Sequence, residues 1–142
     1  MWYFGNKSKI NELELATKKA IRVMFFKRNR DHTLPLFNSI NLLNLHNQCK
    51  LNIFSLLWKI LKGINCSVIQ THFDISIGHH FTRNNFVLPT ATVDLMKRSV
   101  FFSGLKMWNN EVSLHLKQLP ETANFKRRVL RSLAQDQGFS IK

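Results

Sequence analysis

The segment that most restricts the fold is residues 44–62, the most hydrophobic stretch of the chain. Gly63 follows at once and can adopt the left-handed conformation that ends a helix. Lys50 and Lys59 interrupt the stretch, so no apolar run approaches the roughly 20 residues needed to cross a bilayer. We therefore expect a buried central helix. Its inward residues recur at helical spacing and are Leu45, Cys49, Ile53, Leu56, Leu57, Ile60 and Leu61.

A first helix is predicted over residues 8–26. Lys18, Lys19 and Arg22 lie on its polar side. The basic run 27–31 then breaks the pattern and is expected to form a loop. The apolar face predicted for this helix consists of Ile10, Leu13, Thr17, Ala20, Ile21 and Met24.

Two further helices have recognisable start signals. Thr33 followed by Pro35 predicts a short helix that ends near Ile40, because a hydroxyl can cap a helix and proline is tolerated in its first turn. The last helix is predicted over residues 122–135, with Thr122 as its N-cap. Its buried stripe is expected to be Phe125, Val129 and Leu133.

The central region, residues 64–95, has the least regular pattern. A short helix is expected over residues 67–73, and residues 78–89 have an extended or hairpin-like pattern. Helix is expected again over residues 97–109. The whole chain, residues 1–142, is therefore predicted to be a single, mainly α domain with an irregular or hairpin-like central segment.

The charge is strongly positive and uneven. The chain has 21 Lys and Arg against 8 Asp and Glu, a net charge of +13. Residues 1–31 carry +5 and residues 97–142 carry +6, whereas residues 32–96 carry only +2. Such an excess of like charge favours an anionic partner, and nucleic-acid phosphates are the one we expect, although solvated helix faces are the alternative. The candidate phosphate contacts are Lys18, Lys19, Arg22, Lys27, Arg28, Arg30, Lys97, Arg98, Arg127, Arg128 and Arg131.

Aromatic residues stand beside several of these cations. Phe25-Phe26 precedes Lys27, and Phe101-Phe102 follows Arg98. Exposed rings at these positions could stack on bases. Core packing is the interpretation that we favour, because aromatic residues on helices are usually buried. The three tryptophans, Trp2, Trp58 and Trp108, are also assigned to packing.

The sequence contains no recognisable metal or catalytic motif. Cys66, His72 and His79-His80 lack the spacing of a zinc site, and two cysteines cannot build a disulfide framework. A nucleophile elbow and a glycine-rich phosphate loop are also missing. We therefore predict no cofactor and no catalytic residue, and an intracellular, cytoplasmic or nuclear location. The central and nearby carboxylates are too scattered for a magnesium site: Asp74, Asp94 and Glu111.

Several short segments, in order, resemble a known family. They are Trp2-Tyr3-Phe4-Gly5, Lys18-Lys19-Ala20-Ile21-Arg22-Val23-Met24, Asp31-His32-Thr33-Leu34-Pro35-Leu36-Phe37, Leu42-Leu43-Asn44-Leu45, Asn85-Phe86-Val87-Leu88-Pro89, Lys97-Arg98-Ser99-Val100, Gly104-Leu105-Lys106-Met107-Trp108-Asn109 and Phe125-Lys126-Arg127-Arg128-Val129-Leu130. Their order and spacing resemble the region downstream of the polymerase core in LINE-type, non-LTR retrotransposon reverse transcriptases, jockey-like and related lineages. The chain departs from the family pattern where Asn110-Glu111-Val112 replaces the usual Leu-Pro, and where Thr90-Ala91-Thr92-Val93 lacks an arginine.

The resemblance implies a function because it covers only a part of the family's protein that lies outside its catalytic domains. In that family an upstream palm domain performs RNA-directed DNA synthesis and an N-terminal endonuclease cuts DNA, and this chain resembles neither. It implies a non-catalytic, basic module, or a truncated remnant, that holds RNA or DNA and contacts the upstream polymerase core. Two alternatives are a structural lobe without nucleic-acid contacts and a cationic helix bound to a membrane surface. The membrane alternative is disfavoured because no Trp- or Leu-rich face opposes a Lys-rich one. We also expect no small-molecule substrate.

Overall fold

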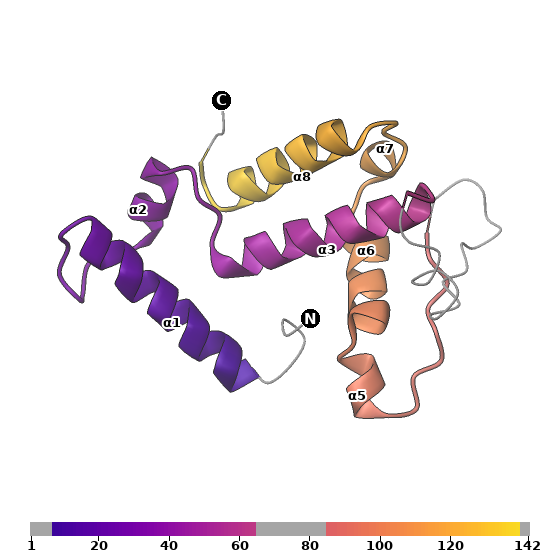
Figure 1. Ribbon diagram of the computed structural model, residues 1–142, viewed down its shortest axis with the longest axis horizontal. Helices are drawn as coiled ribbons and strands as arrows, with labels where there is room; N and C mark the ends of the chain where they lie inside the picture. The colour runs from indigo at the N-terminus through magenta and orange to yellow at the C-terminus, as the bar shows by residue number, and fades with distance from the viewer. Residues whose placement is uncertain (1–6, 65–84, 140–142) are drawn as a thin grey trace.

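The computed structural model describes residues 7–64 and 85–139 (Figure 1). These residues are mainly helical, which confirms the predicted fold class. The predicted helix 67–73, most of the hairpin-like segment 78–89, and Trp2 lie outside the described residues. The elements are α1 (Lys7–Met24), α2 (Leu34–Ser39), α3 (Leu45–Leu61), α5 (Asp94–Lys97), the π-helical turn η1 (Val100–Gly104), α6 (Leu105–Glu111), α7 (Leu114–Lys117) and α8 (Thr122–Asp136).

Helix α3 is the central element, as predicted. Its N-cap is Asn44, whose side-chain oxygen accepts a hydrogen bond from the backbone N–H of Asn47 at 2.8 Å. The buried arc is wider than the predicted stripe, because α8 packs on one side of α3 and η1 with α6 on another. Ile53, Leu57 and Ile60 are buried as predicted, whereas Leu45, Cys49, Leu56 and Leu61 are only partly buried. The prediction missed Asn47, Leu51 and Phe54, and Trp58, which was assigned to packing but not to this stripe, is also buried.

Aromatic rings form the centre of the main core, where α3, α6 and α8 meet. Trp58 of α3 stacks on Phe125 of α8 at a centroid distance of 5.5 Å, and Trp108 of α6 lies 5.8 Å from the same ring. Phe54 and Phe86 each present an edge-to-face contact to Trp108. The packing role predicted for Trp58 and Trp108 is therefore confirmed.

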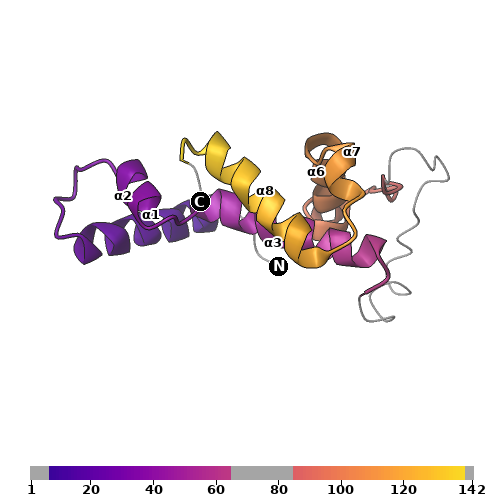
Figure 2. The same cartoon turned by 90° about the horizontal axis from the view of Figure 1, so that it is seen from above.

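Helix α8 follows the sequence pattern closely. Phe125, Val129 and Leu133 are buried, and the helix lies along α3 (Figures 1 and 2). The predicted cap is wrong by one residue. Glu121 has the extended backbone of an N-cap, and Thr122 is the first residue of the helix.

The predicted helix over residues 97–109 is broken into three pieces. Ser99 has an extended backbone between α5 and η1, and the chain then continues through the π turn into α6. Serine competes for backbone hydrogen bonds and has a low helix propensity, which makes a break at this position inexpensive. The hydroxyl of Ser103 donates to the carbonyl oxygen of Lys97 and bridges the break. Helix α7 has no counterpart in the sequence prediction.

Helices α1 and α2 form a separate small core at one end of the elongated molecule (Figure 2). Ile21, Leu36 and Phe37 are buried in it, and Phe25 packs against them. The inward face predicted for α1 is therefore largely wrong, because α2 covers only the part around Ile21. Elsewhere on that face Leu13 is 43% exposed, Met24 is 68% exposed and Ala20 is also exposed, whereas Ile10 and Thr17 are partly buried.

Four of the described helices end in the same backbone motif. At each end the residue after the C-cap has a positive φ, and two backbone N–H groups donate back to carbonyls of the last turn. Glycine or asparagine, which tolerate this conformation, stand there in α2, α3 and α8. Helix α1 instead has Phe26, with φ +52° and a cost of about 1 kcal/mol. The four residues are Phe26, Asn41, Gly63 and Gly138.

Candidate nucleic-acid interface

The loop after α1 holds a first group of exposed cations, Lys27, Arg28 and Arg30. Asp31 closes this loop, because its carboxylate accepts from the backbone N–H of Arg28 at 2.9 Å. The guanidinium of Arg22 donates from Nε to the backbone oxygen of Asp31 at 2.9 Å. Arg22, predicted as a phosphate contact, therefore braces the loop that carries the other three cations.

The cations on the helix before this loop differ in their surroundings. Lys18 is half-buried, and its ammonium lies 2.6 Å from a carboxylate oxygen of Glu14. Lys19 is exposed. Together with Lys27, Arg28 and Arg30, it has no ion pair with any residue in the ranges 7–64 and 85–139. On α1 and the loop that follows it, these four side chains can reach a phosphate without first breaking an ion pair. We call Lys19, Lys27, Arg28 and Arg30 the loop cluster.

A second group lies on the outer arc of α8, opposite its buried stripe. Arg127, Arg128 and Arg131 are all exposed there, and we call them the α8 cluster. Arg128 Nη1 lies 2.6 Å from Nε2 of His115 on α7. Arg127 and Arg131 are four residues apart, so their side chains are neighbours on the helix surface. Neither pairs with a carboxylate among the described residues.

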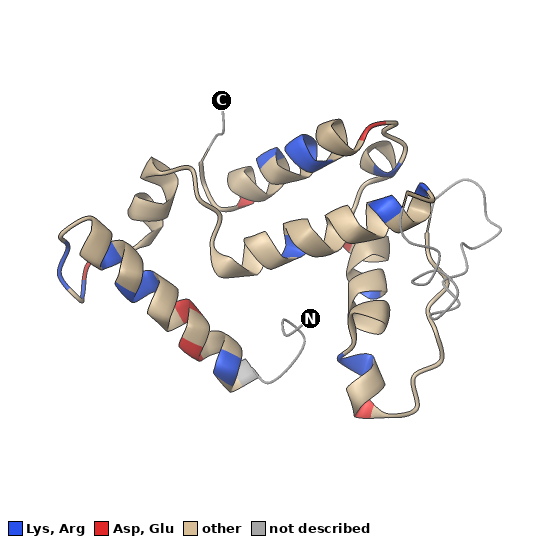
Figure 3. Ribbon diagram, viewed as in Figure 1, with Lys and Arg blue, Asp and Glu red and all other residues tan. Residues whose placement is uncertain are grey.

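The third group, Lys97 and Arg98, stands at the end of α5. Both are exposed, and Lys97 Nζ lies 3.3 Å from a carboxylate oxygen of Asp94. In Figure 1, α5 and α8 lie on opposite sides of α3, and the α1 loop lies at the far end of the molecule. Figure 3 accordingly shows the backbone of the three groups in separate parts of the fold. A nucleic acid that contacts more than one group must run along the molecule.

Two lysines that were not predicted as phosphate contacts differ in their exposure. Lys126 is exposed beside the α8 cluster, and its place in the run Lys126-Arg127-Arg128 could have identified it. Lys117 is buried instead, and its Nζ donates to Oδ1 of Asn85 at 2.8 Å and lies 5.8 Å from the centroid of a Trp108 ring. Burial lowers the pKa of Lys117. Lys117 is therefore a structural residue.

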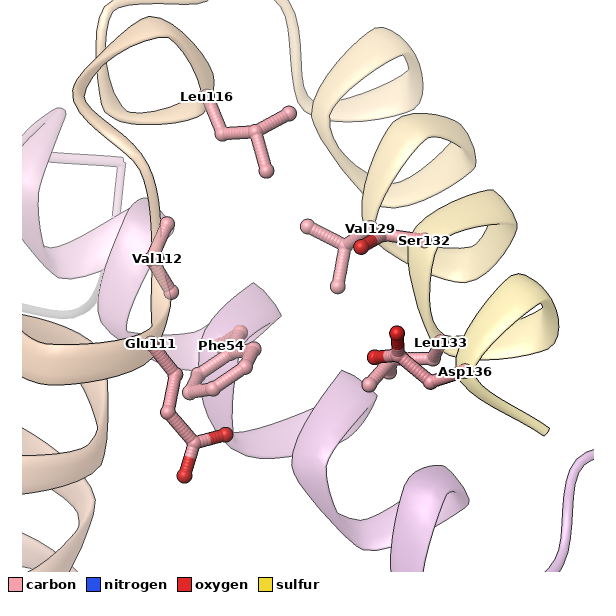
Figure 4. A pocket seen from close by; sticks show the side chains of 8 residues that line it. All are labelled: Phe54, Glu111, Val112, Leu116, Val129, Ser132, Leu133 and Asp136. Atoms are coloured by element: carbon pink, nitrogen blue, oxygen red, sulfur yellow. The ribbon is translucent and has the colours of Figure 1, made fainter.

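A pocket of about 290 Å³ lies between α3, α8 and the segment that joins α6 to α7 (Figure 4). Polar and apolar groups contribute about equally to its walls, and two carboxylates, Glu111 and Asp136, belong to its lining. Glu111 is also paired with Lys50 at 2.7 Å. Its lining residues in the described part of the chain include no Lys or Arg, so the pocket does not continue the basic groups. The other lining residues are Phe54, Val112, Leu116, Val129, Ser132 and Leu133.

The described residues bring no three His, Cys, Asp or Glu side chains together in a way that could hold a metal ion. Within the same part of the chain, no helix is both long and apolar enough to cross a bilayer. No family model, curated protein or solved structure matches this chain. The chemistry of the site therefore has to be inferred from the basic groups themselves.

Proposed function

We propose that this chain is a non-catalytic module that binds the backbone of RNA or DNA. The observation that carries the proposal is that exposed cations of the loop cluster and the α8 cluster lack carboxylate partners among the described residues. Unpaired guanidinium groups bind phosphates well because their donors form a planar fork. In keeping with the resemblance described above, the module is the C-terminal part of a non-LTR retrotransposon reverse transcriptase or a truncated remnant of one.

The mode of binding follows from the kind of groups involved. Each phosphate that a cation neutralises releases condensed counterions, so the affinity depends steeply on salt. Contacts of this kind hold and orient a nucleic acid without reading its sequence. The α8 cluster would hold one stretch of backbone and the loop cluster another, since the two lie apart (Figure 3).

A titration of affinity against salt tests the proposal. A fluorescently labelled duplex should bind the full chain with log K falling linearly as log salt rises, by about 0.9 for each phosphate contacted. The double variant Arg127→Gln/Arg131→Gln should reduce the magnitude of that slope by about 2. A flat salt dependence in the unaltered chain would contradict the proposal.

A matched variant separates local contacts from total charge. Lys59→Gln/Lys106→Gln also removes two positive charges, but at exposed positions outside the three groups. It should leave the slope unchanged, because distant exposed charges are screened by salt. Equal effects of the two double variants would show that only net charge matters, which the proposed local contacts do not allow.

One observation favours a second candidate, a lobe that packs against a polymerase core. The uncovered face of α1 includes Leu13 and Met24, and Val23 next to it is 74% exposed. Exposed apolar surface of this kind is typical of a surface that another protein covers. If this candidate is correct, the isolated chain aggregates, a polymerase core added in trans prevents the aggregation, and the salt titration is flat.

Sequencing the genomic DNA immediately upstream of Met1 tests the proposed retrotransposon origin, since a polymerase with an Asp-Asp motif should be encoded there.

A further inference from the structure

Phe26 follows the end of α1, at the left-handed position where α2, α3 and α8 have asparagine or glycine. It is 97% exposed and has φ +52°, at the position where Asn41, Gly63 and Gly138 end their helices. A residue with a large side chain is disfavoured in this conformation, and a ring left in water gains no burial. The fold therefore does not explain a phenylalanine at this position.

The neighbouring residue behaves in the opposite way. Phe25 is partly buried and packs against the small core of Ile21, Leu36 and Phe37. Core packing, which the sequence favoured for both rings, is thus confirmed for Phe25 and wrong for Phe26. Phe26 lies beyond the last residue of α1, in the left-handed turn that ends the helix, and there it is exposed.

Exposed cations follow Phe26 closely in the sequence. Lys27, Arg28 and Arg30 follow it on a loop whose shape is fixed by the hydrogen bonds of Asp31. An exposed ring beside several cations is the combination that binds single-stranded nucleic acids, where bases stack on rings and cations contact the adjoining phosphates. A duplex cannot use the ring in this way, because its base faces are already stacked on each other.

We propose that Phe26 is a stacking platform for an unpaired nucleobase, with the loop cluster holding the phosphates on either side of that base. This inference rests on the proposed function and adds to it a binding site for a single-stranded or locally unpaired stretch of RNA or DNA, beside the backbone contacts that a duplex also makes. The stacking is sequence-tolerant, since every base has a π-face.

The test compares one labelled single strand of about 20 nucleotides with the duplex of the same sequence, by fluorescence anisotropy on the full chain. Phe26→Leu keeps an apolar side chain but removes the π-face. It should weaken single-strand binding by about tenfold and change duplex binding by less than about twofold. Phe26→Trp should bind the single strand at least as tightly as the unaltered chain. Val23→Ala, which trims another exposed apolar side chain nearby, should change neither affinity.

Phe26→Gly excludes misfolding as the cause of the loss. Glycine relieves the left-handed strain, so the melting temperature should rise by about 2 °C while single-strand affinity falls as in Phe26→Leu. A gain in stability together with a loss of binding cannot come from a damaged fold. Arg28→Gln/Arg30→Gln should behave differently, with weaker binding to both probes and a shallower salt dependence.

The possible failures are distinguishable. If the unaltered chain binds both probes and Phe26→Leu binds the single strand equally well, the stacking role is overturned and the proposed function is not. If the unaltered chain binds neither probe, both are overturned. If the unaltered chain binds vesicles rich in phosphatidylserine, and Phe26→Leu retains that binding while Phe26→Gly loses it, the ring is a membrane contact instead.

Discussion

Gln137, the C-cap residue of α8, accepts a hydrogen bond through its side-chain oxygen from the backbone N–H of Asn44, the N-cap residue of α3, at 2.9 Å. Its amide nitrogen donates to the backbone oxygen of Leu42 at 3.2 Å. Nearby, the side chain of Asn47 donates to the backbone oxygen of Leu133 at 3.2 Å. These bonds connect the start of the central helix to the end of the last one, and Gln137 is buried among them.

We expect Gln137→Ala to lower the free energy of unfolding by about 2 kcal/mol. The substitution removes two part-buried hydrogen bonds, because the Asn44 N–H and the Leu42 carbonyl lose their partner, and unsatisfied groups there are costly. Urea denaturation followed by tryptophan fluorescence measures the change, since Trp58 lies in the same core. Gln135→Ala alters an exposed glutamine of the same helix and should shift stability by less than about 0.5 kcal/mol. Equal stabilities for the two variants would contradict the role of Gln137.

Asn109 provides a second test of a polar connection. Its side chain accepts from the N–H of Phe86 at 3.0 Å and donates to the backbone oxygen of Phe86 at 2.8 Å, which fixes the extended segment against α6. Asn109→Ala removes both bonds and should destabilise the chain by about 2 kcal/mol in urea denaturation. Asn110→Ala, at an exposed neighbour, is the control and should be nearly neutral. The prediction is wrong if both variants unfold at the same urea concentration.

Amphipathic spacing predicted the parts of the fold that have one buried face. In α8 the main neighbour, α3, covers one face, so Phe125, Val129 and Leu133 could be identified from their spacing alone. In α3 the ring of Phe54 packs against Trp108 of α6, a second neighbour that no local pattern reveals.

The same limit applies to polar contacts and to the candidate site. Nothing in the sequence distinguishes buried Gln137 from exposed Gln135, because the difference comes from residues more than 90 positions away. Composition indicated which cations are candidates, but not that Arg22 braces the loop after α1 while the cations of that loop stay exposed. The exposure of Phe26 depends on a turn conformation that a phenylalanine rarely adopts. Residue propensities alone therefore predict that the ring is buried.

The pKa of Lys117, lowered by burial, predicts a pH dependence of stability. Between that lowered pKa and the ordinary value for lysine, the unfolded chain binds more protons than the folded one. The free energy of unfolding should therefore rise with pH across this interval. Lys117→Met removes the titrating group, so its unfolding free energy should rise less between about pH 8 and about pH 10.5 than that of the unaltered chain. Lys106→Met, at an exposed position, should keep the full rise. A rise in Lys117→Met as large as in the control would refute the prediction.

Arg22 and Arg30 both belong to the predicted phosphate contacts, but the structure gives them different surroundings, and this difference can be measured. Arg22 is half-buried and donates to the backbone oxygen of Asp31, whereas Arg30 is exposed. Arg22→Gln should lower the free energy of unfolding by about 1 kcal/mol, because the loop loses a charge-assisted hydrogen bond. Arg30→Gln should leave stability unchanged and instead weaken nucleic-acid binding with a shallower salt dependence. Urea denaturation and the salt titration, applied to both variants, separate the two roles. If Arg30→Gln were as destabilising as Arg22→Gln, the assignment of Arg22 as the brace of the loop would be wrong.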